Sequence, residues 1–282
     1  MKVLYWQDMT SIEIRKLTTN TLTHPTLIIF PLAVVEAHGP FMPTGCDAKM
    51  ARMFAHLVCR SVMNMFPNKK VQIVIYDSLT DLGVVSSTYE LDGSILHPGE
   101  LTTHLWFVTI RDMYAKGLRH FFFINGDGGT GKSFRALLFR SKSKWTQFFG
   151  SWKGTLDFVS WFEGLGVHVE HAGVHEHAFL KYVCDLADPY TCRLASKLRM
   201  SAYRLTDDNL HSLEEFQPKK YPSPPGEIVS WKQIPGQEES AGVSSFSLDE
   251  YHRILDSGEI GHLWEQRLEE ISNYMAERIL HM

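Results

Sequence analysis

Three side chains that commonly bind metals lie near one another in the first part of the chain: Glu36, His38 and Asp47. They follow the apolar residues 27–32, which are expected to form a buried strand. Carboxylate oxygens and imidazole nitrogens suit Zn²⁺, Mn²⁺ or Fe²⁺. A carboxylate such as Asp47 can also bridge two metals, and a bridged pair can bind and polarise water. Because E-x-H is a short pattern, a plain loop in which Asp47 caps a helix stays open as the alternative.

A glycine-rich loop at 126–133, Gly-Asp-Gly-Gly-Thr-Gly-Lys-Ser, satisfies the phosphate-loop pattern G-x-x-x-x-G-K-[ST] between an expected strand and an expected helix. In such a loop backbone N–H groups cradle phosphates, while Lys132 would reach the outer phosphates and Ser133 would hold Mg²⁺. No expected strand ends in an aspartate suited to Mg²⁺, since Asp157 stands at the start of its strand. Nucleotide binding is therefore kept as the alternative function.

A third polar segment, residues 169–177, is rich in histidine and glutamate. These side chains could bind a metal or transfer protons. A polar loop that caps a helix beginning near His175 would have the same composition. The residues concerned are Glu170, His171, His175, Glu176 and His177.

The elements that must position these loops alternate between strand and helix patterns. This order predicts a mostly parallel sheet covered by helices on both faces. Ligands of such sheets bind beyond the carboxyl ends of the strands, which is where the polar loops stand. Strands are expected at 26–33, 71–79, 120–125 and 156–162, and helices at 47–65, 100–116 and from 133 to 139 onward.

The composition indicates one α/β domain over residues 1–282, because 44% of the residues are hydrophobic. Residues 217–243, rich in proline, glycine and serine, are expected to form an irregular arm, and residues 247–281 a C-terminal helical region. The net charge of −4 argues against nucleic acid or an anionic membrane as a partner. The sequence shows no membrane span or signal peptide, and its four cysteines lack C-x-x-C spacing, so a cytoplasmic protein with reduced thiols is expected.

Taken together, the polar segments resemble the creatininase (creatinine amidohydrolase) family. The matching segments are Asp-Met-Thr at 8–10, the stretch from Pro31 to Asp47, Asn-Gly-Asp-Gly-Gly at 125–129, and Glu-His-Ala-Gly at 170–173 followed by Glu176. The resemblance implies a creatininase-like three-layer α/β/α fold with two divalent transition metals per chain, Zn, Mn or Fe. It implies that a metal-bound hydroxide hydrolyses a small polar cyclic compound: a cyclic amide, a lactone or a cyclic polyol ketone. Members of the family are commonly homohexamers, so a homo-oligomer is expected.

By position, the resemblance assigns Glu36 to one metal and His38 to the other, with Asp47 bridging them. Asp127 stands where the family has a metal-binding histidine, which keeps an oxygen ligand but adds negative charge. Thr130 replaces the usual asparagine.

The catalytic roles implied by the resemblance fall on Glu170 and His171 beside the substrate, with His171 as proton donor to the leaving atom. Glu176, His175 and His177 are possible additional ligands or supports. The family's usual motif is absent at 86–93, and residues specific for creatinine are not evident. A different substrate is therefore expected, with a non-catalytic protein of the same fold as a further alternative.

Overall fold

In the part of the chain that the computed structural model describes, five parallel strands form the central sheet, in the order β1-β3-β2-β4-β5. The structure describes residues 3–19, 25–38, 42–67, 71–83, 93–95, 97, 99–127, 130, 155–160, 174–185 and 248–281. The strands are β1 (Leu4–Tyr5), β2 (Thr26–Leu32), β3 (Gln72–Ile75), β4 (His120–Asn125) and β5 (Thr155–Ser160).

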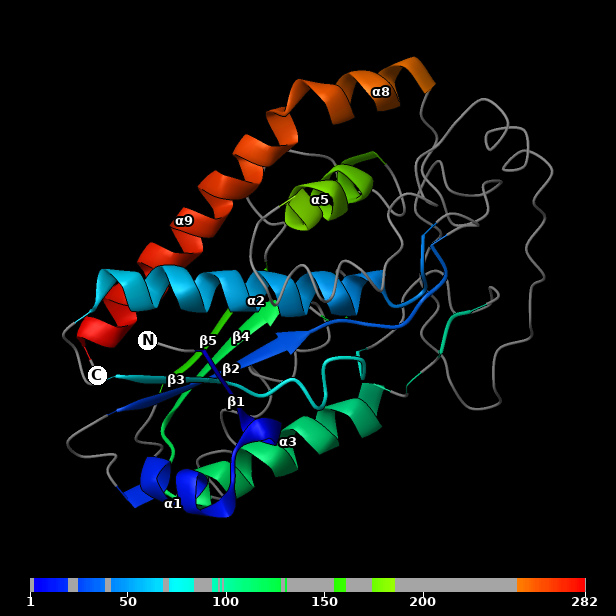
Figure 1. The fold of residues 1–282 in the computed structure, drawn as a ribbon. Coiled ribbons are helices and arrows are strands. Elements are labelled where there is room, and N and C mark those ends of the chain that lie inside the picture. Colours follow the sequence, from blue (N-terminus) through cyan, green and yellow to red (C-terminus); the bar gives the residue numbers. More distant parts are fainter. Residues whose placement is uncertain are drawn as a thin grey trace.

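Helices cover both faces of this sheet, which gives the three-layer α/β/α arrangement expected from the sequence (Figure 1). One layer contains α2 (Cys46–Met65), α5 (Val174–Asp185), α8 (Leu248–Ser257) and α9 (Glu259–Leu280). The opposite layer contains α1 (Ser11–Thr19) and α3 (Gly99–Ala115), and the short 3₁₀ helix η1 (Trp6–Asp8) follows β1.

The central position of β2 in the sheet explains why residues 27–32 are continuously apolar and do not alternate with polar residues. Leu27 and Ile29 pack into the core beneath α2 and α9, whereas Ile28 and Phe30 pack into the core beneath α3. Successive side chains of a strand point to opposite faces, so a strand covered on both sides must be apolar at every position.

Several elements differ from those expected. The strand expected at 71–79 ends at Ile75, because the chain turns at Asp77, whose carbonyl accepts hydrogen bonds from Thr80. The C-terminal helix is divided into α8 and α9 at Gly258, which adopts a left-handed conformation with φ 71°. β1 and α1 were not expected, while the helix expected from 133 and the arm at 217–243 lie outside the described residues.

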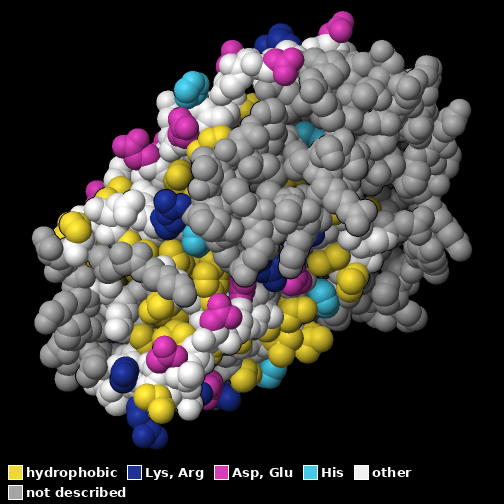
Figure 2. Space-filling model, in the orientation of Figure 1, with side chains coloured by type: hydrophobic (Ala, Val, Ile, Leu, Met, Phe, Trp, Pro, Cys, Tyr) yellow, Lys and Arg dark blue, Asp and Glu magenta, His cyan; other side chains and the backbone are white. Residues whose placement is uncertain are grey.

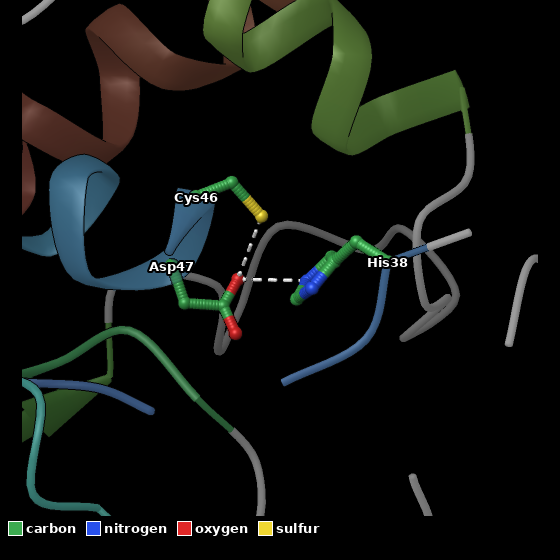
Figure 3. A group of neighbouring side chains, drawn as sticks. All are labelled: His38, Cys46 and Asp47. Atoms are coloured by element: carbon green, nitrogen blue, oxygen red, sulfur yellow. Dashed lines mark hydrogen bonds and ion pairs between the residues drawn. The ribbon is translucent and has the colours of Figure 1, made fainter. Parts of the chain in front are cut away.

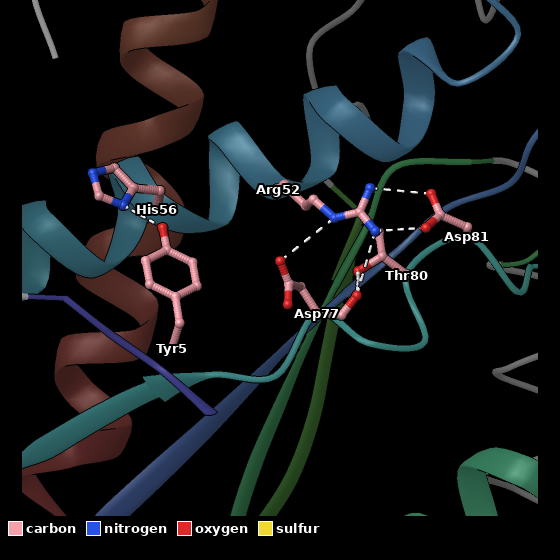
Figure 4. Close-up of polar contacts among 6 residues, drawn as sticks. All are labelled: Tyr5, Arg52, His56, Asp77, Thr80 and Asp81. Carbon is pink, nitrogen blue, oxygen red and sulfur yellow. Dashed lines mark hydrogen bonds and ion pairs between the residues drawn. The ribbon is translucent and has the colours of Figure 1, made fainter. Parts of the chain in front are cut away.

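Polar contacts fasten α2 to the sheet and to the loop after β3 (Figure 4). The guanidinium of Arg52 donates to both carboxylate oxygens of Asp81, at 3.0 and 2.6 Å, and lies 3.6 Å from the Asp77 carboxylate. Farther along α2, the Tyr5 hydroxyl lies 2.7 Å from Nδ1 of His56. These contacts fix the helix whose first turn carries Asp47.

The described surface is charged along α8 and α9, whereas hydrophobic side chains gather near α3 (Figure 2). Leu101 and Leu105 of α3 and nearby Ile95 are among the exposed large hydrophobic residues. None of the helices within the described ranges has the length and apolar character needed to cross a membrane.

Candidate metal centre

The segment that follows β2 is held in place mainly by backbone hydrogen bonds. The N–H of Ala33 donates to the Thr80 carbonyl at 3.0 Å, and the N–H of Glu36 donates to the Thr44 carbonyl at 3.0 Å. Farther along, the N–H of Ala37 donates to the Ser94 hydroxyl at 2.8 Å. Because these bonds satisfy its backbone N–H groups, the irregular segment can be buried. The backbone positions of Glu36 and His38 are therefore fixed.

The His38 side chain is buried, and both of its ring nitrogens have a polar neighbour that orients the ring. Its Nδ1 lies 3.0 Å from the backbone oxygen of Glu36, so Nδ1 carries the hydrogen and donates it. Its Nε2 lies 3.0 Å from Oδ1 of Asp47. A histidine that donates from one ring nitrogen to a carbonyl presents the other nitrogen as a ligand, which is the usual arrangement at protein metal sites.

Asp47 does not cap its helix as the plain-loop alternative proposed. The N-cap residue of α2 is Gly45, which makes no side-chain capping hydrogen bond, and Asp47 lies in the first helical turn. Its carboxylate is directed at His38 instead, and the Cys46 thiol lies 3.6 Å from the same Oδ1 atom (Figure 3). The positive end of the helix dipole favours a carboxylate here.

Asp127 reaches the same place from the neighbouring strand β4. Leu32 and Asn125 are paired in the sheet, and the Gly126 N–H donates to the Leu32 carbonyl at 2.7 Å. The Asp127 carboxylate accepts a hydrogen bond from the backbone N–H of Thr130, and its carbonyl accepts one from the Asn125 side chain. The chain beyond β4 therefore turns back so that Asp127 faces the segment after β2.

Within the described part of the chain, two groups of side chains could each hold a metal ion, and Asp47 belongs to both. One group is His38, Cys46 and Asp47, and the other is Glu36, Asp47 and Asp127, with the ligand atoms of each group within 4.8 Å of one another. The four predicted ligands are at most 7% exposed. Buried carboxylates are unfavourable unless cations or hydrogen bonds compensate them, so this donor set fits divalent metal ions.

The electrostatics of the centre follow from burial and from Asp47. Burial alone lowers the pKa of His38, but the adjacent Asp47 carboxylate and Cys46 sulfur outweigh it and hold that pKa well above its usual value. Burial raises the pKa of the Cys46 thiol to about 12, although His38 opposes this shift. In the metal-free protein a proton therefore occupies His38 near neutral pH, and a metal must displace it.

The first turn of α5 also contributes to the centre. Oε2 of Glu176 lies 3.8 Å from Nε2 of His38, and the Glu176 side chain is 16% exposed. His177 is buried in the same turn. The side chain of His175 and the predicted residues Glu170, His171, Lys132 and Ser133 lie outside the described residues.

Sequence reasoning missed Cys46. A thiolate is a common zinc ligand, and Cys46 directly precedes Asp47, which was the only available signal. Adjacent residues at the start of a helix rarely point at one site, so the convergence of Cys46 and Asp47 becomes visible only in the structure.

Comparison with known proteins gives a family and a fold. The family model described as "Creatininase: Creatinine amidohydrolase" matches residues 7–203. No curated protein sequence matches the chain.

Solved structures with the same fold share little sequence with this chain. A structure described as "Creatininase Mn" has 15% identity and a TM-score of 0.61, covering 98% of this chain and 99% of that one. A creatinine amidohydrolase (creatininase) crystal structure has 14% identity and a TM-score of 0.58, covering 99% and 98%. A mutant creatininase described as Zn-Zn type has 15% identity and a TM-score of 0.57, covering 99% of each chain.

Proposed function

The chain belongs to the creatininase family of metal-dependent amidohydrolases, and on that premise we propose that it opens the ring of a small polar compound by hydrolysis. The substrate classes are those that the family resemblance implies: a cyclic amide, a lactone or a cyclic polyol ketone. The family's name describes creatinine hydrolysis, but residues specific for creatinine are not evident in this chain. We therefore propose a different ring as the substrate.

The observation that carries this proposal is the position of Asp47 between two groups of ligands. We assign one divalent ion to Glu36, Asp47 and Asp127, and a second to His38 and Asp47 with Glu176 nearby. Zn, Mn and Fe are the metals that suit these donors. Two such ions, when bound, would lower the pKa of water and polarise the carbonyl of the substrate.

The protein's own contribution is to hold the donors rigidly and away from bulk water. The carbonyl of Glu36 orients the His38 ring, and the N–H of Thr130 orients the Asp127 carboxylate. Fixed donors need little rearrangement when charge develops on the substrate, which favours catalysis. We propose that Glu170 and His171 handle protons, with His171 protonating the leaving atom.

The nucleotide-binding alternative is not favoured. In a phosphate loop the backbone N–H groups at 126–133 would face a phosphate. Here the N–H of Thr130 donates to the Asp127 carboxylate, and that negative charge would repel a phosphate.

Cytoplasmic location and assembly into a homo-oligomer are part of the proposal. Cys46 and Cys59 are free thiols, which supports a reducing compartment. The exposed side chains of Ile95, Leu101 and Leu105 near α3 support a contact between subunits. Light scattering on the purified protein measures the oligomer directly.

Metal content per chain, measured by elemental analysis, tests the two-metal centre. We expect about two transition-metal ions in the wild type and the loss of both in Asp47→Asn, which keeps the shape but weakens both groups of ligands. Asp81→Asn is the matched control, because Asp81 is bound to Arg52 outside the centre. Wild-type protein that takes up no transition metal after reconstitution would contradict the proposal.

A further inference from the structure

We propose that Cys46 supplies a sulfur ligand to the metal on the His38 side, so that the two metal positions differ in chemistry. One position then offers nitrogen, sulfur and oxygen, and the other, formed by Glu36, Asp47 and Asp127, offers oxygen alone. This inference rests on the proposed two-metal function and specifies its metals.

The geometry around Asp47 supports a shared ion. Oδ1 of Asp47 is approached by Nε2 of His38 at 3.0 Å and by Sγ of Cys46 at 3.6 Å (Figure 3). Two tetrahedral zinc ligands are expected about 3.3 Å apart for nitrogen and oxygen and about 3.5 Å apart for sulfur and oxygen. The two separations from Oδ1 are each within a few tenths of an ångström of these values, and all three ligand atoms lie within 4.8 Å of one another, so one ion can reach all of them.

The place of Cys46 in its helix also suits a metal-bound thiolate. Cys46 is the first residue of α2 and is fully buried, so its sulfur lies at the positive end of the helix dipole. On metal binding the S–H bond breaks, the proton leaves to solvent and the sulfur electron pair forms the bond to the metal. Glu176, 3.8 Å from His38, lies close enough to complete the shell.

The two positions should consequently select different metals. A site with imidazole and thiolate favours zinc, whereas a site of carboxylates alone favours Mn²⁺ or Mg²⁺. Asp127 contributes to this difference, because it adds a further carboxylate oxygen to Glu36 and Asp47 on its side. The expected occupant is one zinc ion on the His38 side and one harder ion on the Asp127 side.

Cobalt(II) as a spectroscopic probe tests the sulfur ligand without any substrate. The metal-free full-length protein is loaded with Co²⁺, and its absorption spectrum is recorded together with its cobalt content. We expect a thiolate-to-cobalt charge-transfer band in the wild type and in Cys59→Ser, and no such band in Cys46→Ser. Cys59 is a matched control, because it is a second buried thiol on α2 outside both groups of ligands.

The outcomes separate this inference from the function on which it rests. Cobalt bound by the wild type without a thiolate band, or a band that persists in Cys46→Ser, overturns the sulfur ligand and leaves the two-metal centre standing. No cobalt binding at all overturns both. A wild-type spectrum without the band overturns the sulfur ligand even if the variant does not fold. Zn²⁺ affinity in Cys46→Ser is expected to fall by at least about tenfold.

Discussion

Nε2 of His38 lies 3.0 Å from Oδ1 of Asp47, although the two residues come from different elements. His38 stands in the irregular segment after β2, and Asp47 in the first turn of α2. Both side chains are almost fully buried, so the interaction between them is weakly screened by water. A proton and a metal ion therefore compete for the same pair.

This competition predicts that metal binding strengthens as the pH rises. The pKa of His38 is held well above 6.5, so the metal-free protein keeps this proton at neutral pH and loses it on metal binding. At pH values below this raised pKa, Zn²⁺ affinity should increase by about tenfold per pH unit for each proton displaced. Titration against a chelator of known affinity measures this slope.

His38→Asn should reduce the slope of Zn²⁺ affinity against pH by about one proton. His262→Asn should leave this slope unchanged, because the His262 side chain is 82% exposed on α9. The metal-free protein should show the opposite trend in stability. The protonated pair contributes its full stabilisation below the unfolded pKa of His38 and loses it as the pH rises through the raised folded pKa. An equal slope in His38→Asn and the wild type contradicts the prediction.

Glu36→Gln should stabilise the metal-free protein. Glu36 is 3% exposed and shares a cluster with the carboxylates of Asp47 and Asp127, so removing its charge relieves repulsion worth about 1–3 kcal/mol. The same change should remove most of the stabilisation that added metal produces. Urea unfolding with chelator and with metal measures both effects.

Asp81→Asn is the control for that experiment, because it removes a carboxylate that is paired with a cation. Asp81 is half-exposed and pairs with Arg52, so its loss should lower the free energy of unfolding by at most about 1 kcal/mol, with or without metal. If the metal-free Glu36→Gln protein is less stable than the metal-free wild type, the carboxylates of this cluster do not repel one another as predicted.

Much of the centre could be predicted because its residues follow strands. Glu36 and His38 come after β2 and Asp127 comes after β4, and parallel strands that neighbour each other end at the same edge of the sheet. The contribution of Cys46 depends on the angle at which α2 begins, which no local pattern encodes. β1 has only two residues, too few for any alternation to show, and it is a strand because β3 pairs with it.

Lys132→Ala should leave metal content and metal-induced stabilisation unchanged. Lys132 is the residue on which a phosphate loop depends, whereas the proposed centre uses Asp127 from the same loop. Asp127→Ala should therefore lose metal where Lys132→Ala does not. Elemental analysis of the two variants, together with thermal melting in the presence of ATP, distinguishes the metal-dependent hydrolase from the nucleotide-binding alternative. Stabilisation by ATP that depends on Lys132 would support nucleotide binding.

The junction between α8 and α9 predicts opposite effects for two glycines three residues apart. Gly258 has φ 71° with open space around its Cα, so Gly258→Ala should lower the free energy of unfolding by about 1 kcal/mol through backbone strain alone. Gly261 lies in α9, where an added Cβ would make ordinary contact with Tyr182 at 3.4 Å. Gly261→Ala should raise the free energy of unfolding by up to about 1 kcal/mol. Urea unfolding in which both changes have the same sign contradicts this description of the junction.

Gly83→Ala should damage the metal centre although Gly83 is not a ligand. An added Cβ would collide with the backbone oxygen of Ala33 and the hydroxyl of Thr130, and would lie 2.6 Å from Cγ1 of Val34. The collision with Ala33 cannot be relieved by rotating a side chain, because that oxygen belongs to the backbone leading to Glu36. The collision with the Thr130 hydroxyl should displace Thr130, whose N–H donates to the Asp127 carboxylate.

The expected result is a loss of about 1–3 kcal/mol in the free energy of unfolding, with reduced metal content in the protein that remains folded. Gly45→Ala is the matched control, because Gly45 directly precedes Cys46 and Asp47, yet its added Cβ would meet only Nζ of Lys49, at 3.5 Å. That variant should keep its metal and lose less than about 1 kcal/mol. Chemical denaturation and elemental analysis of the two proteins settle the comparison. If Gly45→Ala loses more metal than Gly83→Ala, the prediction is wrong. Metal content would then depend on proximity in sequence to the ligands and not on the close packing between the loops after β2, β3 and β4.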